Sequence, residues 1–114
     1  MSLAPINLAS VQLAAVNFSA SGDNTLVAAV AGKLIQLVRI FVVVAAATNL
    51  TFKDGTGGTA LSGPIPMAAN GSITLDIAPV TDFPWYSTSN VANNLVLNSS
   101  AAVQVSGTIW YSQV

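Results

Sequence analysis

The clearest structural signal in the sequence lies near the C-terminus and reads Val103-Gln104-Val105-Ser106-Gly107-Thr108-Ile109-Trp110-Tyr111-Ser112. Apolar and polar residues alternate along most of this stretch. Alternation with a period of two is typical of a strand with one face in a core and the other toward solvent. The stretch therefore predicts a β-strand over residues 103–111. Its inward side chains are expected to be Val103, Val105, Ile109 and Tyr111.

Two further stretches predict strands. Residues 72–77 alternate in the same way. Residues 34–45 are apolar in both phases, as expected of a central strand that is buried on both faces. A helix competes there, because Lys33, Gln36 and Arg39 would share one helical face. The six β-branched residues between positions 35 and 44 favour the strand.

The N-terminal strand pattern is irregular. Val11 and Leu13 lie in one phase, whereas Val16 and Phe18 lie in the other. A bulge near Ala14-Ala15 would let both pairs face the same core. We therefore predict a bulged strand in this region.

Stretches rich in Gly, Pro, Asn and Asp separate these segments, at 21–24, 54–58, 62–66 and 70–71. Short strands are expected between them at 49–53 and 94–98, and Asn70-Gly71 is a strong hairpin signal. The pattern predicts an all-β fold, an antiparallel two-sheet β-sandwich that is jelly-roll-like. Residues 1–10, with Pro5, are expected to form an N-terminal arm, and residues 11–114 a single β-sandwich domain.

The 114-residue chain carries very little charge. It has three Lys or Arg, four Asp or Glu, no His and no Cys, while 53% of its residues are hydrophobic. Charged residues make up 6% of the chain, against about 25% in ordinary soluble domains. We expect partner molecules to cover such a surface. The net charge of -1 supplies no basic patch for phosphates, so nucleic-acid binding is not expected.

One apolar stretch, residues 26–47, is long enough to span a bilayer as a helix. Lys33 and Arg39 would lie inside that span, at about 2.5–3.5 kcal/mol each. Two strands around Ala31-Gly32 explain the stretch better. No membrane contact is therefore expected.

Acid–base and nucleophilic catalysis usually depends on His, on paired carboxylates or on a tuned Lys. The chain has no His, and its four carboxylates are Asp23, Asp54, Asp76 and Asp82. We interpret them as loop and surface residues, so that no enzyme activity, catalytic residue or cofactor is expected. The loop 54–58 or Asp23-Asn24 offers at most a weak calcium site, and no metal ligand is assigned.

Four aromatic residues form the candidate interface: Trp110, Phe83, Trp85 and Tyr86. The last three belong to one short run, which either closes one end of the sandwich or forms a contact loop. Trp110 falls in the phase opposite to the inward residues of its strand, beside Thr108 and other polar residues. A large indole on a polar face is typical of an interface.

Several stretches of the chain resemble small virion structural proteins of tailed bacteriophages. They are Asn49-Leu50-Thr51-Phe52-Lys53-Asp54-Gly55, Ala60-Leu61-Ser62-Gly63-Pro64, Ala68-Ala69-Asn70-Gly71 and Asn94-Leu95-Val96-Leu97-Asn98-Ser99-Ser100-Ala101-Ala102-Val103-Gln104-Val105-Ser106-Gly107. The resemblance covers residues 35–112 and consists of strand and turn residues. It implies a β-sandwich subunit that decorates or cements a capsid, or one that sits on a tail or fibre.

Composition and resemblance together lead to one expected function and one alternative. The expected function is that of a non-enzymatic phage virion protein on the capsid surface. As a cement or decoration subunit, most simply a homotrimer, it would bind the major capsid protein and bridge capsomers. The alternative is a tail-fibre or receptor-binding domain that recognises host-surface glycans. A small hydrolase is disfavoured because the chain has no His.

Overall fold

The computed structural model describes residues 10–76 and 83–114. Nearly all of the expected N-terminal arm therefore lies outside the described residues, as do Ile77 and Asp82. Within the described ranges the chain forms strands and no α-helix. The strands are β1 (Gln12–Phe18), β2 (Gly22–Val27), β3 (Ile35–Val44), β4 (Thr48–Asp54), β5 (Thr59–Ala60), β6 (Ile65–Met67), β7 (Ser72–Leu75), β8 (Tyr86–Ser87), β9 (Leu95–Ser99) and β10 (Val105–Gln113).

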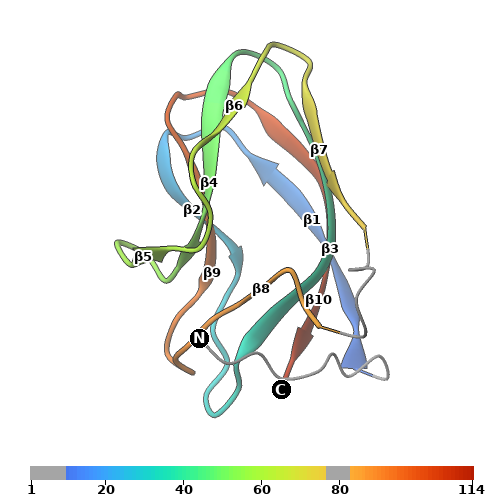
Figure 1. Cartoon of the computed structure of the whole chain (residues 1–114), viewed down its shortest axis with the longest axis vertical. Coiled ribbons are helices and arrows are strands. Elements are labelled where there is room, and N and C mark those ends of the chain that lie inside the picture. The colour runs from blue at the N-terminus through green and yellow to red at the C-terminus, as the bar shows by residue number, and fades with distance from the viewer. Residues whose placement is uncertain (1–9, 77–82) are drawn as a thin grey trace.

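The strands form two antiparallel sheets that face each other (Figure 1). Sheet A has the order β1-β10-β3-β7, and β8 also pairs with β3. Sheet B has the order β2-β9-β4-β5, and β6 also pairs with β4. Each of the steps from β1 to β2, β2 to β3 and β3 to β4 carries the chain to the opposite sheet. This interleaved order is that of a jelly roll, and it confirms the predicted all-β two-sheet sandwich.

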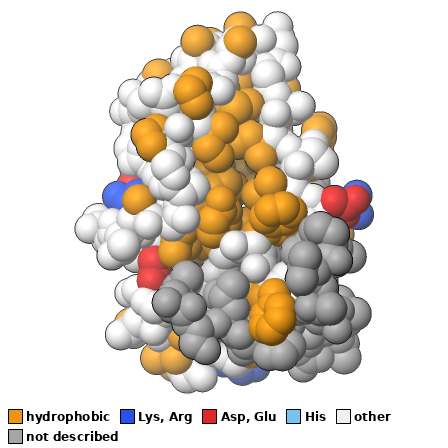
Figure 2. All heavy atoms as spheres, in the orientation of Figure 1, with side chains coloured by type: hydrophobic (Ala, Val, Ile, Leu, Met, Phe, Trp, Pro, Cys, Tyr) orange, Lys and Arg blue, Asp and Glu red, His pale blue; other side chains and the backbone are white. Residues whose placement is uncertain are grey.

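The core lies between the two sheets and is made of inward side chains from both. Hydrophobic side chains form a band down the middle of the face in Figure 2, between the strands of sheet A and those of sheet B. The Phe52 ring of sheet B is fully buried and stacks on Tyr86, with 4.9 Å between the ring centroids. Sheet packing of this kind needs one apolar face from each sheet.

Most of the predicted strands are confirmed. β4 covers the expected strand at 49–53, β9 covers 95–98 of the one at 94–98, and β7 covers 72–75 of the one at 72–77. In β10, Val105 and Ile109 are fully buried and Tyr111 packs against the core, as alternation predicted. Residues 26–47 contribute the end of β2 and all of β3. In the described part of the chain, no helix is long and apolar enough to cross a membrane.

The bulge predicted near Ala14-Ala15 is wrong. β1 pairs with β10 in an unbroken register along its whole length. Regular alternation turns Val16 and Phe18 toward the core and Leu13 outward, where Leu13 is 63% exposed. A bulge would have left one residue of the ladder without a backbone partner. The regular register pairs all seven residues of β1 and leaves one leucine side chain exposed, which satisfies more backbone hydrogen-bonding groups.

The bulge lies in β3 instead. Arg39 is opposite Trp110 and Leu37 is opposite Tyr111, so Val38 is one extra residue in β3. The extra residue switches the inward phase from even positions after it to odd positions before it. The predicted burial of both faces holds for residues 35–38 and is wrong beyond them, since Phe41 is 44% exposed.

Asn70-Gly71 forms a turn but not the predicted hairpin. The flanking strands lie in different sheets, because β6 pairs with β4 and β7 pairs with β3. The Asn70 N–H donates to the Val44 carbonyl at 2.8 Å, and the Val44 N–H donates to the Gly71 carbonyl at 3.0 Å. Asn70 has a φ of 62°, as the dipeptide suits. The dipeptide specifies the local backbone, and contacts with β3 decide where the next strand goes.

Gly107 permits an unusually close approach of β10 to β3. An ideal Cβ at this position would lie 1.8 Å from the Phe41 carbonyl oxygen. Real Cβ atoms never come so near a backbone oxygen. The central pair of sheet A therefore depends on the missing side chain, and Phe41 is held directly across from Thr108 on the outer side.

Candidate functional site

The outer side of sheet A carries large apolar side chains in cross-strand rows. In one row Leu13 is opposite Trp110, and Trp110 is opposite Arg39. In the next row Thr108 lies opposite Phe41. We name this surface the tryptophan face. Its residues are Leu13, Ala15, Asn17, Arg39, Phe41, Val43, Ser72, Thr74, Ser106, Thr108 and Trp110.

Trp110 is half-buried on this face, on the side opposite to Ile109, as its phase predicted. The Arg39 guanidinium carbon lies 4.9 Å from the centroid of the Trp110 ring, a cation–π contact. Arg39 Nε also lies 3.2 Å from Asp76 Oδ1, in an ion pair whose side chains are 43% and 69% exposed. An exposed pair adds little stability, but it helps to hold the guanidinium over the ring.

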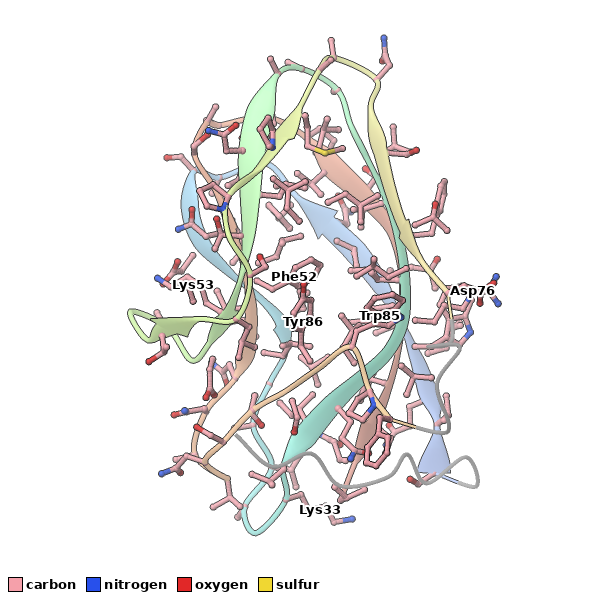
Figure 3. All side chains as sticks on the ribbon, in the orientation of Figure 1. Lys33, Phe52, Lys53, Asp76, Trp85 and Tyr86 are labelled. Carbon is pink, nitrogen blue, oxygen red and sulfur yellow. The ribbon has the colours of Figure 1, made fainter. Side chains whose placement is uncertain are left out.

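The aromatic run 83–86 divides between the surface and the core. Trp85 and Phe83 are exposed, whereas Tyr86 stacks on Phe52 between the sheets (Figure 3). The Trp85 backbone N–H donates to the Leu37 carbonyl at 2.9 Å, and its indole N–H donates to the Asp76 carbonyl. Trp85 thus lies beside the backbone of Asp76, whereas Tyr86 packs against the core.

The tryptophan face has the composition of a contact surface. Outer faces of antiparallel sheets are normally polar, yet here Leu13 and Phe41 are exposed beside Trp110. Trp and Arg are enriched where proteins bind proteins, and exposed apolar groups there lose water on contact. Sequence reasoning found Trp110 and missed Leu13 and Phe41. Residues two apart lie on the same face of a strand. Because Arg39 is charged and should face water, its position would have placed Phe41 on the outer side as well.

Polar side chains on the outer side of sheet B form hydrogen bonds with one another. The Asp23 carboxylate accepts hydrogen bonds from Asn98 Nδ2 at 2.7 Å, from the Gly57 N–H at 2.7 Å and from Lys53 Nζ at 3.0 Å. These bonds, led by the one from Asn98, lower the pKa of Asp23 from 3.8 to about 2. The cluster fastens the turn 54–58 to β2 and β9. It is a structural clamp, with the carboxylate already paired to a cation.

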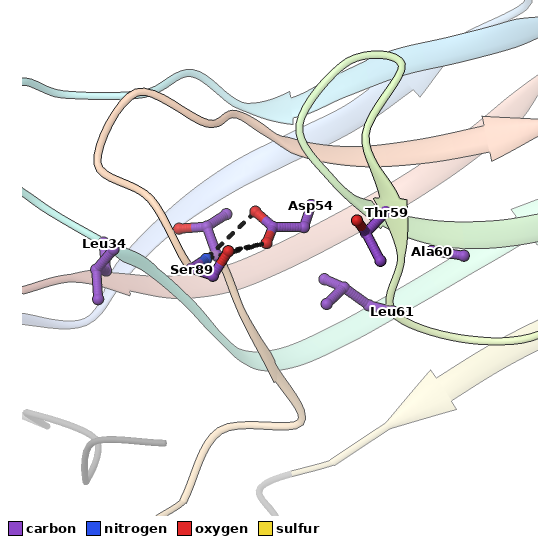
Figure 4. Close-up of a pocket in the computed structure, with 7 residues that line it drawn as sticks. Leu34, Asp54, Thr59, Ala60, Leu61 and Ser89 are labelled. Atoms are coloured by element: carbon purple, nitrogen blue, oxygen red, sulfur yellow. Dashed lines mark hydrogen bonds between the residues drawn. The ribbon is translucent and has the colours of Figure 1, made fainter. Parts of the chain in front are cut away.

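A cavity of about 570 Å³ opens near the end of β4 (Figure 4). Asp54 lies in its wall and is buried. The Asp54 carboxylate accepts from Ser89 Oγ at 2.5 Å, from the Ser89 N–H at 3.1 Å and from Asn93 Nδ2 at 2.9 Å. No sequence pattern predicts this contact, because Asp54 and Ser89 are 35 residues apart. Because these donors already occupy both carboxylate oxygens, Asp54 fixes the loop 88–93 to β4.

The carboxylates of Asp23 and Asp54, in the two loops considered for calcium, already accept these hydrogen bonds from the protein. Among the described residues, no three His, Cys, Asp or Glu side chains lie close enough together to hold a metal ion. Comparisons of the chain with protein-family models, with curated proteins and with solved structures found no match.

Proposed function

We propose that this protein is a non-enzymatic assembly subunit of a bacteriophage virion, a cement or decoration protein that binds the capsid surface through the tryptophan face. The observation that carries the proposal is the row of Leu13, Trp110 and Arg39 with Phe41 beside it, which leaves large apolar groups in water on a sheet face. Such a patch on a soluble domain is typical of a protein-binding site.

Two further observations support the proposal. The chain has only seven charged residues, as suits a subunit whose surface is mostly covered in its working state. Its jelly-roll topology occurs in viral capsid domains and in lectins, which is an argument by analogy. The resemblance of residues 35–112 to small phage virion proteins favours a virion subunit, on the capsid or on the tail.

The proposed subunit would act by reinforcing the contacts between neighbouring capsomers. A standard protein interface covers about 800 Å² per partner, and the described chain exposes 5553 Å² in total. A capsid footprint together with contacts between copies would therefore cover a large share of the surface. Each subunit that bridges two neighbouring capsomers adds buried area, which opposes their separation under internal pressure.

The proposed oligomer is a homotrimer of such subunits, bound where capsomers meet. Few ion pairs are available, so its assembly should depend weakly on salt. Light scattering at tens of micromolar protein, in low and high salt, measures both properties. A stable monomer would remove the trimer and leave capsid binding by monomers.

Immunogold labelling of intact virions tests the location. The cement function predicts label over the whole head. Particles depleted of the protein should have normal shell geometry but lose DNA more readily on heating, and adding back the purified protein should restore heat resistance. Label at the tail tip would overturn the proposal. Heat resistance equal to wild type with a loss of adsorption to host cells would favour the glycan-binding alternative.

A further inference from the structure

The open edges of the two sheets differ in their protection against pairing with another strand. Sheet B ends on one side in β2, which carries Asp23 and one extra residue, Leu26. Its other side ends in β5 and β6, of two and three residues, with Pro66 inside β6. Charge, bulges, proline and shortness are the devices by which natural sheets block edge pairing. Both edges of sheet B are therefore protected.

Sheet A has one protected and one unprotected edge. On one side it ends in β7 and β8, of four and two residues, and Asp76 directly follows β7. On the other side it ends in β1, which has seven residues, no charge, no proline and an unbroken register with β10. Within the described ranges β1 pairs with β10 alone. Among the edge strands of the described ranges, β1 is thus the one that has no charge, bulge or proline and is not short.

We propose that the outer edge of β1, which pairs with no other described strand, pairs antiparallel with β1 of a second copy of this chain, so that the two A sheets form one continuous sheet. Alternate backbone N–H and C=O groups of an edge strand point away from its neighbour, and a second strand supplies their partners. The inference goes beyond the proposed function, because it assigns the contact between copies to one strand and makes it a two-fold alternative to the homotrimer; contact with the capsid is common to both arrangements.

The sequence of β1 suits pairing with itself. The register that pairs all seven residues places Ala15 opposite Ala15 of the second copy, and Leu13 opposite Asn17. No like charges meet, because β1 carries none, and the small Ala15 side chains occupy the centre. On the outer side, the row of Arg39, Trp110 and Leu13 in one copy would continue into Asn17 of the second copy.

Two-fold pairing of this kind closes on itself as a dimer, because the same patch is used by both copies. A homotrimer would need a different contact, in which two unlike patches meet. The mass of the assembly therefore separates the two arrangements. A dimer that depends on β1 supports the inference, whereas a monomer, or a trimer that ignores changes in β1, overturns it.

Ala15→Lys tests the contact directly. It places two lysines opposite each other at the centre of the junction, and we expect at least a tenfold rise in the dimer dissociation constant by analytical ultracentrifugation. Thr74→Lys is the matched control, since Thr74 lies on the same face at the opposite edge of sheet A and is exposed. Mixing Ala15→Lys with Ala15→Glu should restore dimers as mixed pairs. Equal weakening by both lysine variants would overturn the proposal.

Ala15→Cys gives a second readout that does not depend on charge. The natural chain has no cysteine, so a disulfide-linked dimer can arise only at the new position. Directly opposite residues of antiparallel strands have Cα atoms about 4.5–5.5 Å apart, within disulfide range. Mild oxidation should link Ala15→Cys and leave Thr74→Cys unlinked. Equal linkage of both variants would overturn the proposal. Capsid binding by Trp110→Ala, a change outside β1, tests the proposed function separately.

Discussion

Side chains alternate between inner and outer faces in both sheets, but the two outer faces differ in how far their side chains are buried and hydrogen-bonded. On sheet B, Val96 lies between Thr25 and Lys53 in the register and is fully buried, and the polar groups beside it bond to one another. On sheet A, Phe41 holds a comparable central position and is 44% exposed. The same strand geometry thus produces one closed face and one open face.

The two ion pairs show the same contrast. Lys53 and Asp23 on sheet B are 19% and 13% exposed, and the pair fastens a turn of its own chain. Arg39 and Asp76 on sheet A are both more than 40% exposed, and the guanidinium lies over an indole. The polar groups of sheet B bond to one another within the chain, whereas those of sheet A are left open to solvent. This difference is the reason for proposing a binding site on the tryptophan face.

The largest effect is expected when a charge is placed on the inner side of sheet A. Val105→Asp would bury an unpaired carboxylate at a fully buried position, at a cost of several kcal/mol. Typical domains have only about 5–15 kcal/mol of stability, so the variant should be largely unfolded by circular dichroism. Ser106→Asp, one residue along on the outer side, should fold normally. Equal melting of the two variants would mean that the assigned phase of β10 is wrong.

Gly107→Ala tests the backbone that supports the tryptophan face. Its Cβ would collide with the Phe41 carbonyl, and overpacking of this kind costs about 3 kcal/mol. Urea unfolding should show a lower midpoint. Gly63→Ala is the control, because a Cβ at Gly63 meets nothing within 4 Å. A midpoint for Gly107→Ala as high as that of the control would contradict the close approach of β10 to β3.

Trp110→Ala tests the open face itself. We expect capsid binding or self-association to weaken by about 2 kcal/mol, roughly 30-fold in affinity, with little change in monomer folding. Val91→Ala, an exposed apolar residue outside the tryptophan face, should leave binding unchanged. Unchanged affinity of Trp110→Ala would remove this face as the binding site.

Fluorescence sharpens the same test. In a Trp85→Phe background Trp110 is the only tryptophan, and iodide should quench it in the dissociated subunit and not in the assembly. Equal shielding in both states would place Trp110 in a permanently covered site. Equal quenching in both states would show that the contact lies elsewhere.

The smallest effect is expected on the closed face, and it depends on pH. Because folding lowers the pKa of Asp23 from 3.8 to about 2, its contribution is present above pH 3.8 and is lost as the pH falls toward 2. We expect about 1 kcal/mol, reduced by screening at this partly exposed site. Asp23→Asn should lose this acid dependence in urea titrations at pH 2 to 5. An unchanged dependence would show that another carboxylate carries it.

Sequence patterns predicted much of the fold but only part of the candidate site. Strand existence followed from alternation at 72–77 and 103–111, and the turn at Asn70-Gly71 followed from the preference of that dipeptide for positive φ. Both are local properties. Trp110 was assigned to the outer side because its neighbours in β10 alternate regularly.

The remaining features depend on residues far apart in the sequence. The irregular apolar spacing in 11–18 suggested a bulge, yet the pairing of β1 with β10 kept β1 regular and left Leu13 outside. The apolar run 34–45 concealed a bulge at Val38, because either burial on both faces or a change of phase gives the same pattern. Asp54 accepts hydrogen bonds from Ser89 only because β4 ends beside the loop 88–93.

Strand periodicity and composition are local properties of the chain, and they suffice to predict an all-β domain with few charges. Which large apolar side chains stay in water, and which strands lie at the sheet edges, depends on the folded arrangement. Cross-strand register sets both, and register depends on backbone hydrogen bonds between segments as distant as β1 and β10. A periodic pattern determines which side chains share one face of a strand. The arrangement of the strands in the folded chain determines whether that face is buried between the sheets or exposed.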